Sequence, residues 1–115
     1  MSIARLSLGA ITDIRCILRR IKAEFGAGAG ARYKELLDQS LRDLEEDPNR
    51  VGVRSVADIR AGYFVYHLKF SKARAKGQPV RHPRHLMVFS VDSSANVLVA
   101  AVLHEREMLE PHLEE

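Results

Sequence analysis

Imidazole side chains are the first residues of this sequence that could do chemistry, because histidine serves both as a metal ligand and as an acid–base catalyst near neutral pH. His82, His85 and His104 are the candidates for a metal set. His82 and His85 lie in a proline-containing stretch, and no cysteine or carboxylate near them completes a set of three ligands. We therefore expect structural or surface histidines, and we predict neither a bound metal nor a cofactor. His104 is open to two interpretations, a contact with a partner or a packing and capping role.

Covalent catalysis has little support from the residue types. Cys16 is the one cysteine in the sequence, so an intrachain disulfide and a thiolate metal site are excluded, and we expect a reducing cytoplasm as its compartment. No serine or cysteine is placed with a histidine and an acid in the way that a nucleophile requires. The glycine-rich residues 26–30 follow no strand and precede no Lys-Ser or Lys-Thr pair, so they do not predict a phosphate-binding loop.

Charge is distributed unevenly along the chain. The net charge is +3, but residues 69–104 hold six Lys or Arg against one acid, and residues 105–115 hold five Glu against one Arg. This pattern predicts either contact with an acidic partner or a tail that folds back on the basic surface, and a solvated loop beside a solvated tail is the alternative. The side chains that we expect to bind a partner are Lys69, Lys72, Arg74, Lys76, Arg81, Arg84 and His104.

The apolar pattern predicts the elements that must position these residues. Apolar residues three and four apart predict a helix over about residues 10–25 and a second one from about 33 to 47, joined by the small residues 26–30. Alternating apolar residues predict strands at 3–8, 63–70, 86–91 and 97–103. The basic link from Ser71 to His85 is the one loop long enough to suggest a function, and we expect it to contribute little to the core.

This order predicts an α+β fold. The first strand is expected to join the three-stranded meander, which gives β-α-α-β-β-β with a four-stranded, mainly antiparallel sheet and a two-helix hairpin packed on one face. With 115 residues, the chain is expected to form a single domain, 1–115, in which 105–115 is an acidic C-terminal tail. The longest apolar run is seven residues, so we expect no membrane span, and charges scattered through the first 25 residues argue against a secretory signal.

A two-helix hairpin can cover only one face of a four-stranded sheet. The other face is expected to expose Tyr63, Val65 and His67 with alternate residues of the last two strands. An exposed apolar face of this kind predicts a binding surface for a partner segment that becomes ordered on binding.

Short words in the sequence carry a resemblance to a known family. They are Ala10 with Asp13-Ile14, Phe25-Gly26, Tyr33, Leu44 to Pro48, Gly62, Tyr66-His67-Leu68-Lys69 with Ser71, Pro83-Arg84-His85, Val102-Leu103-His104-Glu105 and Pro111-His112-Leu113. In this combination and at these separations, the chain resembles the ParE branch of the RelE/ParE toxins of bacterial type II toxin–antitoxin pairs. The resemblance implies a RelE/ParE-like fold and a small toxin of the kind involved in plasmid stabilisation. It also implies neutralisation by a cognate antitoxin, with which the toxin forms a hetero-oligomer.

The resemblance leaves the cellular target open. ParE-like members bind and block DNA gyrase, whereas RelE-like members cut messenger RNA on the ribosome without a metal. Two cations that RelE-like members commonly carry are missing, because this sequence has Phe89-Ser90 and Ala100-Ala101 at those positions. We therefore expect a gyrase-binding inhibitor, and assign no catalytic residue. A messenger RNA endoribonuclease and a non-toxic relative that only binds the antitoxin are the alternatives. The residues that a RelE-like site would draw on are Arg60, His67, Lys69, His85 and His104.

Overall fold

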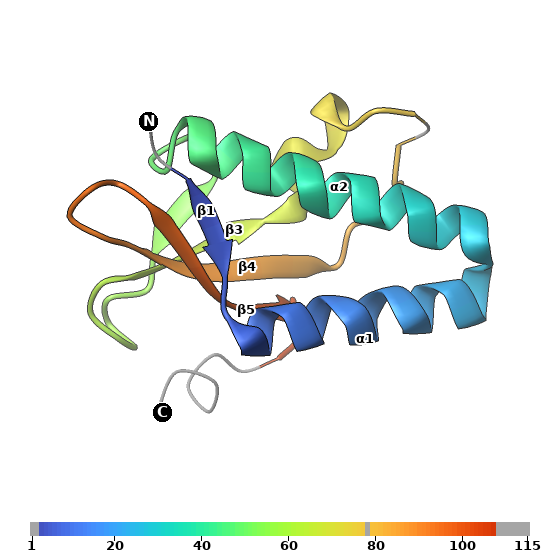
Figure 1. Ribbon diagram of the computed structural model, residues 1–115, viewed down its shortest axis with the longest axis horizontal. Coiled ribbons are helices and arrows are strands. Elements are labelled where there is room, and N and C mark those ends of the chain that lie inside the picture. The colour runs from blue at the N-terminus through green and yellow to red at the C-terminus, as the bar shows by residue number, and fades with distance from the viewer. Residues whose placement is uncertain (1–2, 78, 108–115) are drawn as a thin grey trace.

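Two helices follow each other with a single residue between them, α1 (Leu8–Phe25) and α2 (Ala27–Glu46). The computed structural model describes residues 3–77 and 79–107. The Ser7 hydroxyl caps α1 by accepting a hydrogen bond of 3.0 Å from the Ala10 N–H. Gly26 ends α1 and begins α2 with φ +96°, a conformation that favours glycine. The chain therefore reverses at one residue, and the two helices run side by side (Figure 1).

The connector between the helices is shorter than the sequence predicts. Only Gly26 leaves the helical conformation, whereas Gly28 and Gly30 lie in the first turn of α2. Gly30 is buried, and a Cβ atom there would lie 3.6 Å from Cβ of Lys22 on α1. The small residues thus allow the two helices to pack closely. The sequence predicts a connector over residues 26–30 because glycine is unfavourable in a helix.

Five strands form one mixed sheet in the order β1-β5-β4-β3-β2. The strands are β1 (Ala4–Leu6), β2 (Val53–Ser55), β3 (Tyr63–His67), β4 (His85–Val91) and β5 (Val97–His104). β1 pairs with β5 in parallel, and the other neighbours are antiparallel. The predicted α+β architecture is confirmed, with one strand more than predicted.

Two details of the prediction are wrong. β2 was not predicted, because a strand of three residues is too short to show an alternating pattern. The strand predicted over 63–70 ends at His67, and a 3₁₀ helix, η1 (Leu68–Arg74), follows it. Leu68 and Ser71 in η1 are fully buried, so the first part of the predicted surface loop belongs to the core.

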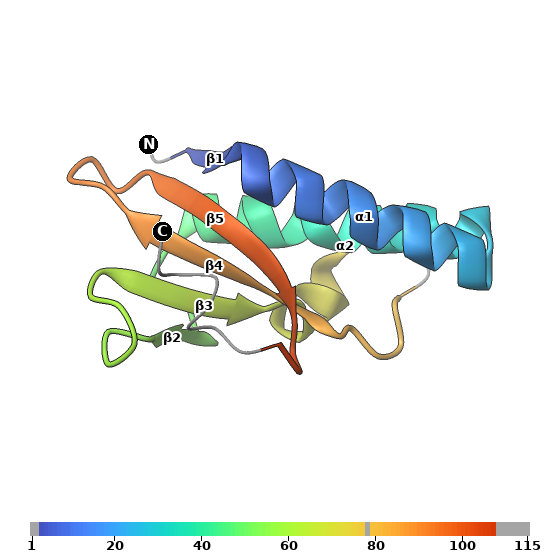
Figure 2. The same cartoon turned by 90° about the horizontal axis from the view of Figure 1, so that it is seen from below.

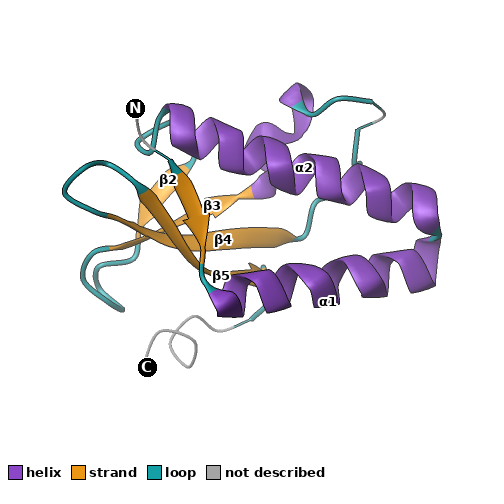
Figure 3. Cartoon of the chain, in the orientation of Figure 1, coloured by secondary structure: helices purple, strands orange, loops and turns teal. Residues whose placement is uncertain are grey.

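Both helices cover the same face of the sheet, as Figure 2 shows, and the sequence of elements can be followed in Figure 3. The main core fills the space between these layers. Its largest fully buried side chains include Leu36, Leu37, Tyr66, Met87 and Phe89. Burying one such side chain stabilises the fold by about 1.5–3 kcal/mol.

The second face of the sheet is not the exposed apolar surface that the sequence predicts. Val65, Val88 and Ala101 pair across three strands on this face, and each is at most 7% exposed. Val56, from the segment that follows β2, packs against them. Tyr63 and His67, which were also expected to be exposed, are half-buried. In the part of the chain that the structure describes, no helix is long and apolar enough to cross a membrane.

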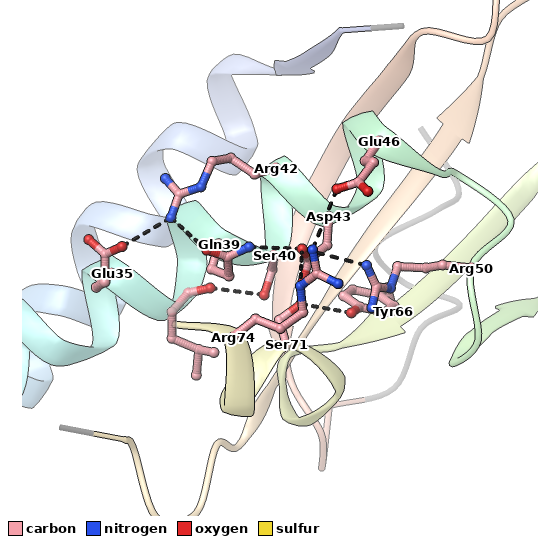
Figure 4. A network of polar contacts seen from close by, with 11 residues as sticks. Glu35, Gln39, Ser40, Arg42, Asp43, Glu46, Arg50, Tyr66, Ser71 and Arg74 are labelled. Carbon is pink, nitrogen blue, oxygen red and sulfur yellow. Dashed lines mark hydrogen bonds and ion pairs between the residues drawn. The ribbon is translucent and has the colours of Figure 1, made fainter. Parts of the chain in front are cut away.

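A buried carboxylate ties η1 to α2 (Figure 4). Asp43 is fully buried, and its oxygens accept hydrogen bonds from Gln39 Nε2 at 2.8 Å and from Ser71 Oγ at 2.6 Å. Because Ser71 gives its one proton to the carboxylate, the Tyr66 hydroxyl donates to Ser71 Oγ, at 2.7 Å. This chain of polar groups fixes the end of β3 and the start of η1 against α2.

Two arginines compensate the charge of Asp43. Arg74 Nε lies 3.0 Å and Arg50 Nη1 3.5 Å from Asp43 Oδ1, and Arg74 also reaches Glu46. A buried charge is tolerated when it is paired and hydrogen-bonded in this way. Arg74 therefore has a structural role, which its position in a basic stretch does not reveal.

Candidate functional site

Three strand ends meet at one end of the sheet, and each carries a histidine. His85 and His104 lie on the face that the helices cover, and His67 lies on the other face. β3 ends at His67, β4 begins at His85 and β5 ends at His104, and these ends coincide because neighbouring strands run antiparallel. His85 pairs directly with His104, and the two ring centroids lie 5.3 Å apart in an edge-to-face arrangement. We call His67, His85 and His104 the histidine cluster.

Tyr33 joins this cluster from α2. Its hydroxyl lies 2.6 Å from His85 Nδ1 and accepts a hydrogen bond of 3.1 Å from the Arg84 N–H. Burial raises the pKa of Tyr33 to about 12, so the hydroxyl keeps its proton at neutral pH. Burial lowers the pKa of His85 to about 4, with a smaller contribution from neighbouring His104. A neutral His85 accepts a hydrogen bond from the Tyr33 hydroxyl at Nδ1, which places its own proton on Nε2.

The other two histidines adopt the same tautomer. His67 Nδ1 accepts from the Lys69 N–H at 3.1 Å, so its Nε2–H donates to Glu105 Oε1 at 2.8 Å. His104 Nδ1 accepts from the Arg106 N–H at 3.1 Å. In all three rings, Nδ1 is therefore occupied by an internal donor and the proton lies on Nε2.

Glu105 pairs with Arg84 and with His67 of the cluster. Its carboxylate accepts from His67 and lies 3.1 Å from Arg84 Nη1, and its N–H donates to the Arg84 carbonyl at 2.8 Å. The hydrogen bonds from His67 and Arg84 lower the pKa of the Glu105 carboxyl below its ordinary value. This residue therefore closes β5 onto β3 and the start of β4.

A groove of about 1170 Å³ is lined by His85 and His104 of the cluster. One wall is a single face of α1, and the others come from the start of α2, residues 79–85 and the end of β5. Five arginines line it: Arg20, Arg32, Arg81, Arg84 and Arg106. Three acids also line it: Asp13, Glu24 and Glu107. Asp13 and Glu107 accept backbone hydrogen bonds from Val102 and His104, so the groove is cationic overall.

The chain matches the family model described as the ParE toxin of the type II toxin–antitoxin system parDE, over residues 4–109. The chain belongs to the ParE toxin family. It is also similar to the toxin–antitoxin complex RelBE2 from Mycobacterium tuberculosis, a crystal structure with 20% sequence identity and a TM-score of 0.51. The match covers 90% of this chain and 96% of the chain compared, and at this identity it shows the RelE/ParE-like fold. No curated protein matches the sequence.

The ParE-family chain brings together only some of the residues that the sequence offered for RelE-like chemistry. His85 and His104 converge, and His67 lies at the same end of the sheet on its other face. Arg60 lies over the Tyr63 ring at the opposite end of β3. Lys69 contributes its backbone N–H to His67, and its side chain lies over the Phe70 ring at 5.2 Å. Arg60 is therefore separate from the histidine cluster.

The cations expected to bind a partner fall into different surroundings. Lys72 donates to the Arg81 carbonyl at 2.7 Å, and Arg74 is paired with Asp43 and Glu46. Arg81 and Arg84 line the groove, as does His104, whereas Lys69 and Lys76 are exposed outside it. A role of these residues in partner binding stays a prediction. The predicted acidic tail lies outside the described residues from position 108 onward.

Sequence reasoning missed two members of the site. Tyr33 was assigned to the apolar face of its helix, a position that its ring does occupy, and nothing in the helical spacing marks its hydroxyl. Glu105 was counted with the acidic tail, although it directly follows His104 at the end of the last strand. Among residues 3–77 and 79–107, no group of three or more His, Cys, Asp or Glu is placed to hold a metal ion.

Proposed function

We propose that this chain is a toxin that a cognate antitoxin neutralises by direct binding, and that it acts by binding DNA gyrase. Family membership supports the first part, since these are toxins of type II toxin–antitoxin systems. The RelBE2 neighbour is itself a toxin–antitoxin complex, which supports a hetero-oligomer with the antitoxin. A target of this kind also places the toxin in the cytoplasm.

One observation supports binding over RNA cleavage, the occupation of Nδ1 in every ring of the histidine cluster. Attack of a ribose 2′-OH on the adjacent phosphate requires a general base with a free lone pair. His67, His85 and His104 all carry their proton on Nε2 and receive a hydrogen bond at Nδ1. As folded, the three rings have an Nε2–H that can donate a hydrogen bond, and they offer no free nitrogen to accept a proton.

Two strand positions at which RelE-like members commonly carry a cation have none in this chain. Cations over the phosphate stabilise its transition state. The position of one missing cation is occupied by Ser90, which is half-buried, and that of another by Ala101, which is 7% exposed. Arg84, the cation nearest to His85 in the chain, is paired with Glu105.

The experiment that tests this proposal measures supercoiling and RNA cleavage side by side. Purified toxin is added to DNA gyrase, ATP and relaxed plasmid, and messages from induced cells are mapped by primer extension. We expect loss of supercoiling that equimolar antitoxin reverses, and no new message ends. Undisturbed supercoiling with new ribosome-dependent cuts would refute the gyrase proposal, and neither effect would favour a relative that only binds the antitoxin.

Metal-independent messenger RNA cleavage is the second candidate. The convergence of His85, His104 and Tyr33 in a groove lined by five arginines favours it. If this candidate is correct, His104→Gln should abolish cleavage while Lys69→Gln, outside the groove, should leave the cut pattern in place. Equal cleavage by both variants would remove the cluster from the reaction.

A further inference from the structure

The solvent-facing side of α1 carries a row of cations. Arg15, Arg19 and Lys22 are all exposed, and steps of four and three residues place them in line along the helix. None of the three lines the groove, which receives Arg20 from the same helix. At a rise of about 1.5 Å per residue, the row spans about 10 Å. We call Arg15, Arg19 and Lys22 the α1 stripe.

No acid compensates the charge of the α1 stripe in the part of the chain that the structure describes. The ion pairs among residues 3–77 and 79–107 include none of its three side chains. The two acids of α1, Asp13 and Glu24, line the groove instead. The cations of the stripe are therefore in contact with solvent and available to an anionic partner.

The neighbouring helix shows the opposite arrangement. α2 also exposes cations, but Lys34 Nζ lies 2.8 Å from Asp38 and Arg42 Nη2 lies 3.0 Å from Glu35. These pairs balance the charge on the solvent side of α2. Outside the groove, the cations of the two helices that lack an acidic partner among the described residues are therefore those of the α1 stripe.

A phosphate backbone is the anion that this surface complements best. Each strand of a nucleic-acid duplex presents one phosphate for about every 3.4 Å of its axis, so a row of about 10 Å can reach up to about three phosphates. Two of the three cations are arginines, whose planar guanidinium group matches the oxygens of a phosphate.

Other anionic partners fit the α1 stripe less well. A protein partner binds mainly through buried apolar or aromatic anchors, and no large apolar side chain of α1 is exposed between Arg15 and Lys22. A single strand binds through bases that stack on aromatic side chains, and this span of α1 contains none. The absence of both features favours contact with the backbone of a duplex.

We propose that the α1 stripe binds the phosphate backbone of a nucleic-acid duplex without reading its sequence. Each of the three side chains contacts one phosphate, and the helix lies along the backbone. The stripe shares no residue with the groove or with the histidine cluster, so this proposal is independent of the gyrase target and of neutralisation by an antitoxin.

The number of phosphate contacts determines how binding responds to salt. Three contacts give a slope of about −2.7 for the logarithm of the association constant against the logarithm of the salt concentration. Affinity should therefore fall about 40-fold between 50 and 200 mM salt. Arg15→Gln with Arg19→Gln removes two contacts, which should make the slope shallower by about 1.8 and weaken binding at 50 mM salt at least about tenfold.

Two double variants with the same loss of charge serve as controls. Lys34→Gln with Arg42→Gln removes two paired cations from α2 and should change affinity less than about threefold. Arg20→Gln with Arg32→Gln removes two cations from the groove and should also change it less than about threefold. All these positions are exposed, so each melting midpoint should stay within about 2 °C of wild type.

The experiment titrates the full chain into a labelled 20-base-pair DNA duplex of arbitrary sequence and follows fluorescence anisotropy. An RNA duplex of the same length and a polyglutamate of equal charge are the comparison probes. We expect both duplexes to bind, polyglutamate to bind more weakly, and the loss to be confined to the stripe variant.

Four outcomes would overturn the proposal. They are binding of neither duplex, binding of only one duplex, equal losses in all three double variants, and the largest loss in the groove variant. Polyglutamate bound as tightly as the duplexes, with the same loss in the stripe variant, would identify an acidic protein as the partner and would overturn the proposal too.

Discussion

Replacing Tyr33 by phenylalanine removes one hydroxyl and keeps the ring that packs in the core. That hydroxyl accepts from the Arg84 N–H at 3.1 Å and lies 2.6 Å from His85 Nδ1. It connects α2 to the start of β4 across 51 and 52 residues of sequence. The variant Tyr33→Phe therefore leaves two polar groups of the site without their partner while changing little apolar packing.

The size of the effect follows from these two groups. A buried polar group left unpaired costs about 1–3 kcal/mol, and water reaching the groove can satisfy part of this loss. We expect Tyr33→Phe to lower the free energy of unfolding by about 2 kcal/mol. For a chain of 115 residues, 1 kcal/mol corresponds to about 4 °C, so the midpoint should fall by about 8 °C.

Thermal unfolding and nitrogen NMR of the histidine rings test this together. Tyr63→Phe is the matched control, because the Tyr63 hydroxyl makes no hydrogen bond with any residue that the structure describes, and its midpoint should stay within about 2 °C. In Tyr33→Phe, the His85 Nδ1 signal should lose the shift caused by its hydrogen bond. An unchanged midpoint together with an unchanged His85 signal would contradict the assigned bridge.

Three further predictions concern pH, the buried carboxylate and a glycine. The pKa of His85 is near 6.5 in the unfolded chain and about 4 in the folded one, so the unfolded chain binds more protons between these values. The free energy of unfolding should therefore fall by about 2 kcal/mol from pH 7.5 to pH 4.5, measured by urea unfolding at each pH. His85→Gln should reduce this dependence on pH, and a dependence equal to that of wild type would refute the assignment to His85. Asp43→Asn should lower the free energy of unfolding by about 3 kcal/mol in the same assay. The control Asp38→Asn, which breaks an exposed pair with Lys34, should lower it by less than about 1 kcal/mol, and equal losses would contradict the buried network. Gly52→Ala should lower the melting midpoint more than Gly62→Ala. Both glycines have positive φ, but only at Gly52 would the new Cβ lie 2.6 Å from the Phe70 ring, so adding Phe70→Ala should recover part of the difference.

Much of the fold could be predicted because it depends on local patterns. The stripe of apolar residues in α1 and the alternation in β4 and β5 are long enough to show their period. β2 has three residues, too few to show a period. The alternating pattern predicts a strand up to residue 70, but the chain turns into η1 after His67 and buries Leu68 and Ser71. These elements are set by tertiary contacts, above all the network around Asp43, which joins groups 28 residues apart.

The candidate site was predicted in residue type but not in arrangement. The sequence offered the three histidines of the cluster, yet the meeting of His85 and His104 on one face, with His67 on the other, depends on the register of β3, β4 and β5. A shift of one residue in a strand would move its histidine to the opposite face of the sheet. Tyr33 could not be found from its spacing, because a tyrosine with a buried ring and a bonded hydroxyl looks like any core residue of an amphipathic helix.

The tautomer of His85 allows one variant, Tyr33→Phe, to distinguish gyrase binding from RNA cleavage. For His85 to act as a general base, Nδ1 must lose the Tyr33 hydroxyl, since Nε2 already carries the proton. Tyr33→Phe frees that nitrogen without removing the imidazole. If the toxin acts by binding gyrase, the variant should inhibit supercoiling as well as wild type per folded molecule, because Tyr33 is only 5% exposed and its hydroxyl is engaged by Arg84 and His85. If it cuts RNA with His85 as base, the variant should change the cleavage rate per folded molecule. The assay is run well below the melting midpoint of both proteins, so that both are folded. If Tyr33→Phe then inhibits supercoiling less than wild type does, the Tyr33 hydroxyl takes part in gyrase inhibition, and a purely structural role for it is refuted.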